Sequence, residues 1–160
     1  FGTIDSDEWK IADRRQAYAL RAVAARAGLW GNHGYEAVYM MTFVDADGAE
    51  LDGEHAYELR LPSAPPVGAL WSLTTYDTPN YYLVANEIDR YSIGDATPGL
   101  SVADDGSITI TMAPHRPDAD RVANWLPTPH GLFRPILRMY MPGDEILNGT
   151  YRVPAIRKLD

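Results

Sequence analysis

Polar side chains of the kinds that bind ligands or move protons gather in one stretch of the chain, residues 76–95. In one interpretation they line a polar pocket at the end of a sheet, where Arg90 holds an anionic group and a Tyr or Asp moves a proton. In the other interpretation, Asp77 stabilises a turn and Arg90 pairs with Asp89 or Asp95. The candidate ligand-binding residues of this stretch are Tyr76, Asp77, Asn86, Arg90 and Tyr91.

A second group of candidates lies between residues 124 and 138, namely Asn124, Trp125 and Arg138. Trp125 could lie over a ligand, although a Trp next to Leu126-Pro127 is also typical of a loop anchor in the core. The alternative function is an enzyme, with a hydrolase or lyase as the expected class. An active site requires several of the candidate side chains to converge on one volume, and another domain or subunit could complete that site. The set to examine is Tyr76, Asp77, Arg90, Asn124 and Arg138.

Other catalytic and metal-binding patterns are missing from the sequence. The chain has no Cys, which excludes disulfides, zinc–thiolate sites and thiol catalysis. None of the four His residues, at positions 33, 55, 115 and 130, has a metal-ligand spacing to another. Nucleophile-elbow, phosphate-loop and dinucleotide-binding motifs are absent as well. We therefore predict no metal site and no cofactor.

Length and charge narrow the class of protein further. With 160 residues, 46% of them hydrophobic, the chain is long enough for one globular domain. A net charge of −8 argues against binding to nucleic acid or to an anionic membrane. No apolar run approaches the roughly 18 residues of a membrane span. The composition does not select a cellular compartment, and a first residue of Phe1 rather than Met indicates a processed or truncated start.

One long helix is expected near the N-terminus, over residues 7–27, because the segment is rich in Ala and Arg and lacks Gly and Pro. Gly28 is the natural stop. An apolar stripe is expected on this helix at Ile11, Tyr18, Ala22, Ala25 and Leu29. The helix could pack on the domain, or it could join or dock onto something upstream.

The rest of the chain has the period-two alternation of β-strands, separated by turn residues. Pro135 places its strand at a sheet edge or near the start of the strand. The pattern predicts a mainly antiparallel β-sandwich or partly closed barrel, and the absence of helices between the later strands disfavours a parallel sheet. The expected strands cover residues 37–44, 57–61, 69–77, 81–85, 107–112 and 133–141, with a last short one ending near Ile156.

An ordered set of short pieces runs over nearly the whole chain. The pieces are Arg21-Ala22 with Gly28, Glu36-Ala-Val-Tyr39, Asp47-Gly48, Leu51-Asp-Gly53, Tyr57-x-Leu-x-Leu-Pro62, Pro65-Pro66, Trp71-Ser-Leu-Thr-x-Tyr-Asp77, Arg90-Tyr-Ser-Ile-Gly-Asp95, Asp105-Gly-Ser-x-Thr-Ile110, Asn124-Trp-Leu-Pro127, Leu137-Arg-x-Tyr140 and Pro154-Ala-Ile-Arg157. In this order they resemble the DUF1214 domain. Trp30 departs from the common pattern of the turn after Gly28, which puts a shared role of that turn in question.

The resemblance implies a jelly-roll-like sandwich over residues 31–160, preceded by a helix and connector at residues 1–30. It also implies a bacterial protein in which a DUF1254 domain lies upstream, and it implies no particular activity. We therefore predict an accessory module that binds a small ligand, a partner domain or a second subunit through residues 76–95 and 124–138. The alternatives are the enzyme described above and a structural domain that docks on its DUF1254 neighbour through the helix at 7–27.

Overall fold

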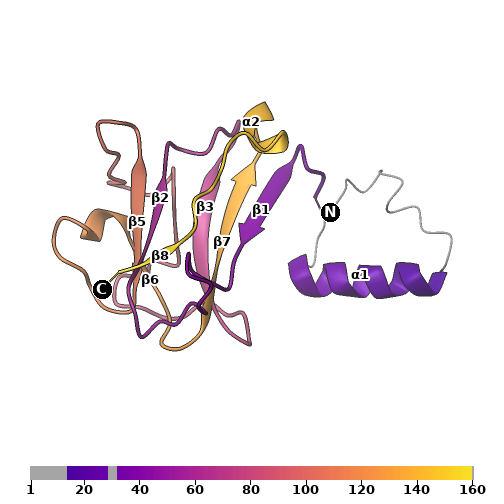
Figure 1. The fold of residues 1–160 in the computed structure, drawn as a ribbon, viewed down its shortest axis with the longest axis horizontal. Helices are drawn as coiled ribbons and strands as arrows, with labels where there is room; N and C mark the ends of the chain where they lie inside the picture. The colour runs from indigo at the N-terminus through magenta and orange to yellow at the C-terminus, as the bar shows by residue number, and fades with distance from the viewer. Residues whose placement is uncertain (1–13, 29–31, 160) are drawn as a thin grey trace.

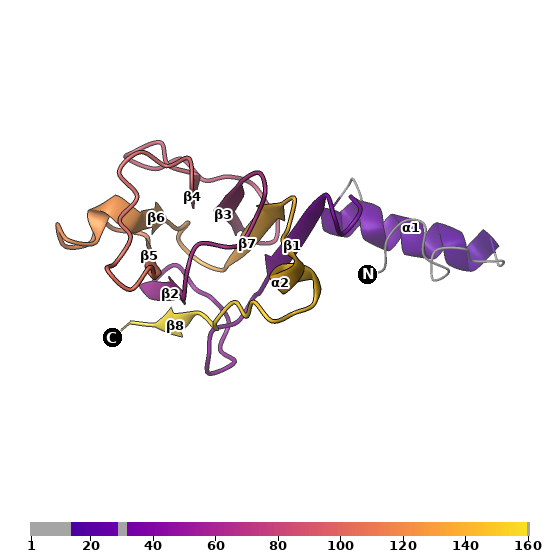
Figure 2. The ribbon, with the colours of Figure 1, turned by 90° about the horizontal axis from the view of Figure 1, so that it is seen from above.

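The structure is a computed structural model, and it describes residues 14–28 and 32–159. Two four-stranded sheets lie face to face as two layers, and α1 lies beyond the β1 edge of the first layer (Figures 1 and 2). The elements are α1 (Arg14–Gly28), β1 (Ala37–Met41), β2 (Tyr57–Leu61), β3 (Trp71–Asp77), β4 (Ser92–Gly94), β5 (Ile108–Ala113), η2 (Val122–Asn124), β6 (Trp125–Pro127), β7 (Phe133–Tyr140), α2 (Asp144–Leu147) and β8 (Arg157–Lys158).

The strand order is β1-β7-β3-β4 in the first sheet and β6-β5-β2-β8 in the second. Every named pair is antiparallel except β5 and β6, which run in parallel. The prediction of a mainly β, antiparallel sandwich with one long helix before it is therefore confirmed. The jelly-roll connectivity that the resemblance implies stays a prediction.

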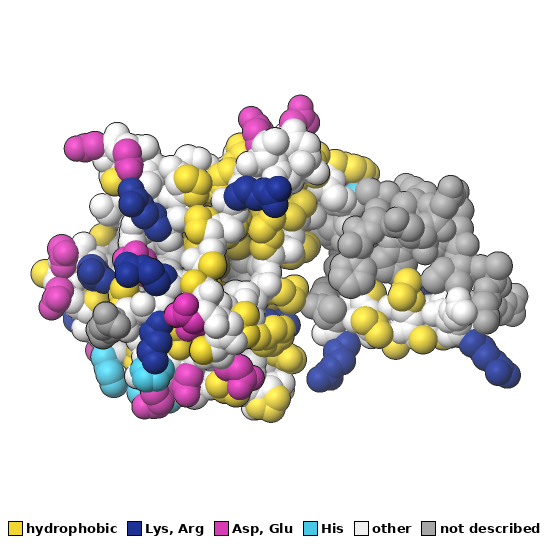
Figure 3. All heavy atoms as spheres, viewed as in Figure 1, with side chains coloured by type: hydrophobic (Ala, Val, Ile, Leu, Met, Phe, Trp, Pro, Cys, Tyr) yellow, Lys and Arg dark blue, Asp and Glu magenta, His cyan; other side chains and the backbone are white. Residues whose placement is uncertain are grey.

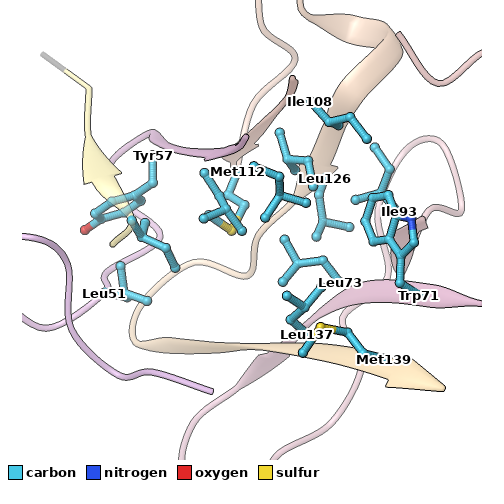
Figure 4. Close-up of a cluster of buried hydrophobic side chains, with 14 of the residues drawn as sticks. Leu51, Tyr57, Trp71, Leu73, Ile93, Ile108, Met112, Leu126, Leu137 and Met139 are labelled. Atoms are coloured by element: carbon cyan, nitrogen blue, oxygen red, sulfur yellow. The ribbon is translucent and has the colours of Figure 1, made fainter. Parts of the chain in front are cut away.

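The core lies between the two sheets, because alternate residues of each strand point inward. Trp71 and Leu73 of β3 meet Leu137 and Met139 of β7 on the inner face of the first sheet, and Leu126 comes from the second sheet (Figure 4). All five side chains are at most 2% exposed, so apolar burial is nearly complete here. This burial fixes the register of both sheets, since a slip by one residue would turn each apolar side chain to the opposite face.

Pro135 lies in a central strand, yet only where that strand has one neighbour. Pro135 pairs with Thr75 of β3. The pairing of β7 with β1 covers only residues 136–140, so it does not reach Pro135. The backbone N–H of Met141 points toward β1, and the alternation of the strand puts the nitrogen of Pro135 on the same side. The missing N–H therefore leaves no ladder bond unmade. Of the two predicted positions, the one near the start of the strand is correct, and the sheet edge is wrong because β7 lies between β1 and β3.

Several expected boundaries were wrong, and one expected strand is absent. Residues 81–85 do not form a strand; instead β4 pairs with β3. The reason lies in the turn, where Tyr81 takes the left-handed conformation (φ 62°) and the N–H of Tyr82 donates to the carboxylate of Asp77. β1 ends at Met41 rather than near residue 44, and the last strand is Arg157–Lys158. The short helix α2 and the parallel strand β6 were not predicted.

The described part of α1 does not pack on its own sandwich. Tyr18 is 72% exposed and Val23 is 56% exposed, and Ala22 and Ala25 are exposed as well. The remaining members of the expected stripe, Ile11 and Leu29, lie outside the described residues, as does the predicted start at residue 7. The helix was expected either to pack on the domain or to join or dock onto something upstream. For its described residues, packing on the domain is wrong.

Tyr151 is expected to make the stability of the fold depend on pH in the alkaline range. Its hydroxyl donates to the backbone carbonyl of Ser63, and burial raises the pKa of Tyr151 to about 12. Because an unfolded Tyr titrates near pH 10, the contribution to stability is complete below pH 10 and is lost as the pH rises toward 12. We expect the free energy of unfolding to fall less steeply over this window in Tyr151→Phe than in the wild type. Urea unfolding at a series of pH values measures this difference, and equal slopes would contradict the assignment.

Candidate functional site

The outer face of the β1-β7-β3-β4 sheet carries an unusual set of side chains for an acidic protein. Its outward positions are Ala37, Tyr39, Met41, Ser72, Thr74, Tyr76, Ser92, Gly94, Arg134, Ile136, Arg138 and Tyr140. The only charged residues among these strand positions are two Arg, although the chain has 22 Asp and Glu against 14 Lys and Arg. We call this surface the outer face.

Arg138 and Tyr76 are joined across the outer face. Nη2 of Arg138 donates to the hydroxyl of Tyr76 at 2.8 Å, although Arg138 pairs with Ser72, four positions away along β3. The two side chains therefore lean toward each other over Thr74 and Ile136. Those two residues point outward and are nevertheless 7% and 6% exposed, which is explained by this cover.

Aromatic rings flank both guanidinium groups. The guanidinium carbon of Arg138 lies 6.0 Å from the ring of Tyr39 and 5.5 Å from that of Tyr76. That of Arg134 lies 4.1 Å from the ring of Tyr81 and 5.4 Å from that of Phe43. Such positions over the ring face stabilise a cation without neutralising it.

Neither of these Arg side chains forms an ion pair with Asp or Glu within the described residues. Nε of Arg134 is buried and has no hydrogen-bond partner. Burial and a hydrogen bond with Tyr140 raise the pKa of the Tyr39 phenol, whereas Arg138 lowers it in part. The outer face therefore presents positive charge on an aromatic background.

Arg90 lies away from the outer face, just before the edge strand β4 of the first sheet. Its Nη1 lies within hydrogen-bond distance of the backbone carbonyls of Val122, Ala123 and Trp125, at 3.2, 3.0 and 2.8 Å. Asn86 holds Arg90 in place, because its amide accepts from the N–H of Arg90 and donates to its carbonyl. Arg90 thus binds the end of η2 to its own loop, rather than pairing with Asp89 or Asp95.

Asn124 and Trp125 are part of the framework as well. The side chain of Asn124 accepts from the N–H of Ser101 and donates to the carbonyls of Ser101 and Thr109, at 2.7–3.0 Å. Trp125 is 1% exposed, and its indole N–H donates to the carbonyl of Ala113. The structure therefore gives Trp125 the role of a core anchor, the second of the two interpretations.

The remaining candidates from the sequence lie at the two ends of the β3–β4 connection: Asp77 is the last residue of β3, and Tyr91 directly precedes β4. The carboxylate of Asp77 accepts from Tyr82 and, at 3.5 Å, from the side chain of Asn80. The hydroxyl of Tyr91 lies 3.5 Å from the carboxylate of Asp89. Of the eight predicted site residues, only Tyr76 and Arg138 come together on an open surface, and the five residues that an enzyme required do not converge.

A match to a family model accounts for most of the sandwich. The model is described as a protein of unknown function, DUF1214, and it covers residues 36–144, more than half of the chain. The chain belongs to the DUF1214 family. The resemblance based on short sequence pieces is thereby confirmed.

Two solved structures are similar to this DUF1214 domain. One is the VPA0106 protein from Vibrio parahaemolyticus, with 33% identity and a TM-score of 0.75 over 93% of this chain. The other is a putative uncharacterized protein from Burkholderia cenocepacia, with 16% identity and a TM-score of 0.49 over 94% of this chain. The chain spans 36% of the Vibrio protein and 44% of the Burkholderia protein. None of the curated proteins in the comparison matches it.

Elsewhere the DUF1214 domain has a small polar pocket of about 210 Å³ beside Asn124 and Thr109, on the outside of the second sheet. It is below the roughly 300 Å³ of typical ligand sites. The rings of His115 and His130 lie 5.5 Å apart, although their sequence spacing gave no sign of it. Within residues 14–28 and 32–159, no three His, Asp or Glu side chains gather as metal ligands, and no helix is long and apolar enough to cross a membrane.

Sequence analysis missed Tyr39 and Arg134 on the outer face of this DUF1214 domain, and it missed Tyr81, whose ring lies 4.1 Å from the guanidinium carbon of Arg134. For Arg134 a signal was present, because residues four apart in a strand point to the same face and Arg138 was already a candidate. For Tyr39 and Tyr81 there was none, since their neighbours come from β7, more than 50 residues along the chain.

Proposed function

We propose that this domain is an accessory module of a longer protein, in which α1 docks onto a DUF1254 domain. One observation carries the proposal: the described residues of α1 expose apolar side chains instead of packing them on the sandwich. A 15-residue helix whose described side chains do not pack on the sandwich is marginal in water by itself, because helices in proteins depend on a packed face. A surface outside the sandwich is therefore needed to hold α1.

The docking face of α1 follows from helical geometry. At about 100° per residue, Leu20, Val23 and Ala24 lie on one side of the helix. Arg21, Arg26 and Tyr18 lie on the opposite side, and Figure 3 shows basic side chains projecting from the helix into solvent. The expected stripe through Tyr18 and Ala22 is thus the basic side. We assign the contact to the side of Leu20 and Val23.

The size of its relatives favours a partner within the same polypeptide. The domain corresponds to 36% of the Vibrio protein, so most of that relative lies outside the matched region. The family resemblance implies that a DUF1254 domain lies in the unmatched part. No separate observation favours the enzyme alternative, because Tyr76 and Arg138 lie on the outer face whereas Arg90 and Asn124 bind backbone carbonyls at η2 and β5.

A pair of neighbouring substitutions tests this proposal. Val23→Glu introduces a charge on the proposed contact, whereas Ala22→Glu introduces the same charge on the opposite side. We expect Val23→Glu to weaken binding to a separately produced DUF1254 domain at least about ten-fold, because an unpaired charge would be buried, and Ala22→Glu to change it less than about three-fold. Calorimetry or surface plasmon resonance provides the affinities.

Three outcomes would contradict the proposal. The first is absence of binding by the wild-type chain. The second is an equal effect of Val23→Glu and Ala22→Glu. The third is a concentration-dependent dimer of the chain alone, seen by light scattering and abolished by Val23→Glu, which would make a second copy the partner.

A further inference from the structure

We propose that the outer face holds a binding site for the carboxylate of a small aromatic acid, built from the guanidinium of Arg138 and the hydroxyl of Tyr76. The site is built from strands of the first sheet, and the inference does not depend on the docking proposed above. It uses two residues that the sequence singles out and that the structure joins by a hydrogen bond.

The first step is the absence of an internal counter-ion. In the described residues, the protein satisfies one donor of Arg138, the N–H that points to Tyr76, and no Asp or Glu pairs with it. A guanidinium has five N–H donors in a planar fork, and two parallel donors match the two oxygens of a carboxylate. Arg138 is only partly buried, and none of its nitrogens is among the buried side-chain atoms that lack a hydrogen-bond partner.

The second step is preorganisation of the cation. The hydrogen bond to Tyr76 draws Arg138 across Thr74 and Ile136, and the ring of Tyr39 flanks it on the β1 side. A side chain that is already held in position loses less conformational entropy when it binds a ligand. The tyrosine hydroxyl accepts from Arg138 and so can donate its own proton to a carboxylate oxygen.

The third step concerns the side chains around Arg138, which favour an acid that carries an aromatic ring. Tyr39 projects from β1 opposite Arg138, and Met41 projects two residues further along, opposite Ile136; they are 39% and 43% exposed. An aromatic ring attached to the carboxylate would cover these side chains, which removes apolar surface from water. A second cation on the same strand, Arg134, adds positive potential, while the ring of Tyr81 covers its guanidinium. Arg138 is therefore the open cation of the pair.

Benzoate is a suitable probe, and benzamide is its neutral counterpart of nearly the same shape. We expect benzoate to shift the amide NMR signals of β1, β3 and β7 with a dissociation constant on the order of millimolar, as a shallow site allows. At constant ionic strength, benzamide should bind at least about ten-fold more weakly, because it lacks the charge that a guanidinium recognises.

Variants separate this site from a general effect of charge. Arg138→Gln should weaken benzoate binding at least about ten-fold, whereas Arg152→Gln, at an exposed position elsewhere, should leave it unchanged. Tyr76→Phe keeps the ring and removes the hydroxyl, and should weaken binding about three-fold to ten-fold. Well-dispersed amide spectra of each variant show that the sandwich is still folded.

Equal binding of benzoate and benzamide would overturn carboxylate recognition, as would benzoate affinity that is the same in Arg138→Gln and in the wild type. Shifts confined to other surfaces would overturn the location. Val23→Glu should leave benzoate binding unchanged, so failure of the docking proposal and failure of this inference can be told apart.

Discussion

Replacing Trp125 with Ala is expected to lower the free energy of unfolding by about 3–5 kcal/mol, as is typical for large aromatic side chains in a core. Trp125 is 1% exposed, and its indole N–H donates to the carbonyl of Ala113 at 2.9 Å. The substitution leaves both a cavity and a carbonyl without its partner. Urea unfolding followed by far-UV circular dichroism measures the loss.

Trp125→Phe is the matched variant, since it keeps most of the ring and removes the hydrogen bond. We expect it to lower the free energy of unfolding by about 1–3 kcal/mol, less than Ala does. If the free energy of unfolding of Trp125→Ala lay within about 0.5 kcal/mol of the wild-type value, Trp125 would not be a core anchor. The interpretation of Trp125 as a ligand-binding ring would then be favoured.

Replacing Arg90 with Met is expected to lower the free energy of unfolding by about 2–4 kcal/mol, because hydrogen bonds to a charged donor are worth about 1.5–3 kcal/mol each and these share one nitrogen. The carbonyls of Val122, Ala123 and Trp125 would lose their shared donor. The methyl thioether of Met keeps much of the apolar stem, so the change reports mainly on the guanidinium. The same urea unfolding measurement applies.

Arg116→Met provides the comparison for Arg90. Arg116 is exposed and approaches Glu87 at 3.9 Å, and exposed pairs of this kind are worth about 0–1 kcal/mol. We expect this variant to be nearly as stable as the wild type. Should both variants lose the same small amount, the structural role of Arg90 would be wrong, and the side chain would be available for an anionic ligand.

The strands that alternation predicts well are those with one face in the core. Residues 57–61, 71–77, 108–112 and 133–140 are examples, because burial of every second side chain leaves a period that the sequence must show. The segment 81–85 has equally suitable residue types and is not a strand. There the carboxylate of Asp77 binds the backbone of Tyr82, and the chain turns away from β3. Composition alone does not report such a local hydrogen bond.

The candidate site was predictable in its parts and not in its arrangement. Tyr76 and Arg138 are both visible as candidates, but their hydrogen bond depends on the register of β3 against β7, 62 residues apart. Arg90 and Asn124 look equally suited to ligand binding. Their partners are backbone carbonyls, which every residue has, so the sequence carries no sign of them.

The sequence predicts that the helix α1 forms, but it does not predict which side of the helix is covered. Its residue types predict α1 correctly, and helix propensity is a local property. Which side of a helix is covered depends on a surface elsewhere, and the Ala-rich sequence of α1 has weak contrast between its sides. Exposure of Tyr18 and Val23 in the structure is what separates docking from packing on the domain.

Hydrogen exchange of the α1 amides, residues 14–28, tests the central claim most directly. The chain is measured alone and then in complex with its DUF1254 domain. If α1 is held by that domain, its amides exchange fast in the chain alone and at least about 100-fold more slowly in the complex, while the amides of β3 and β7 are protected in both. Equal exchange of α1 in the two samples would contradict the claim.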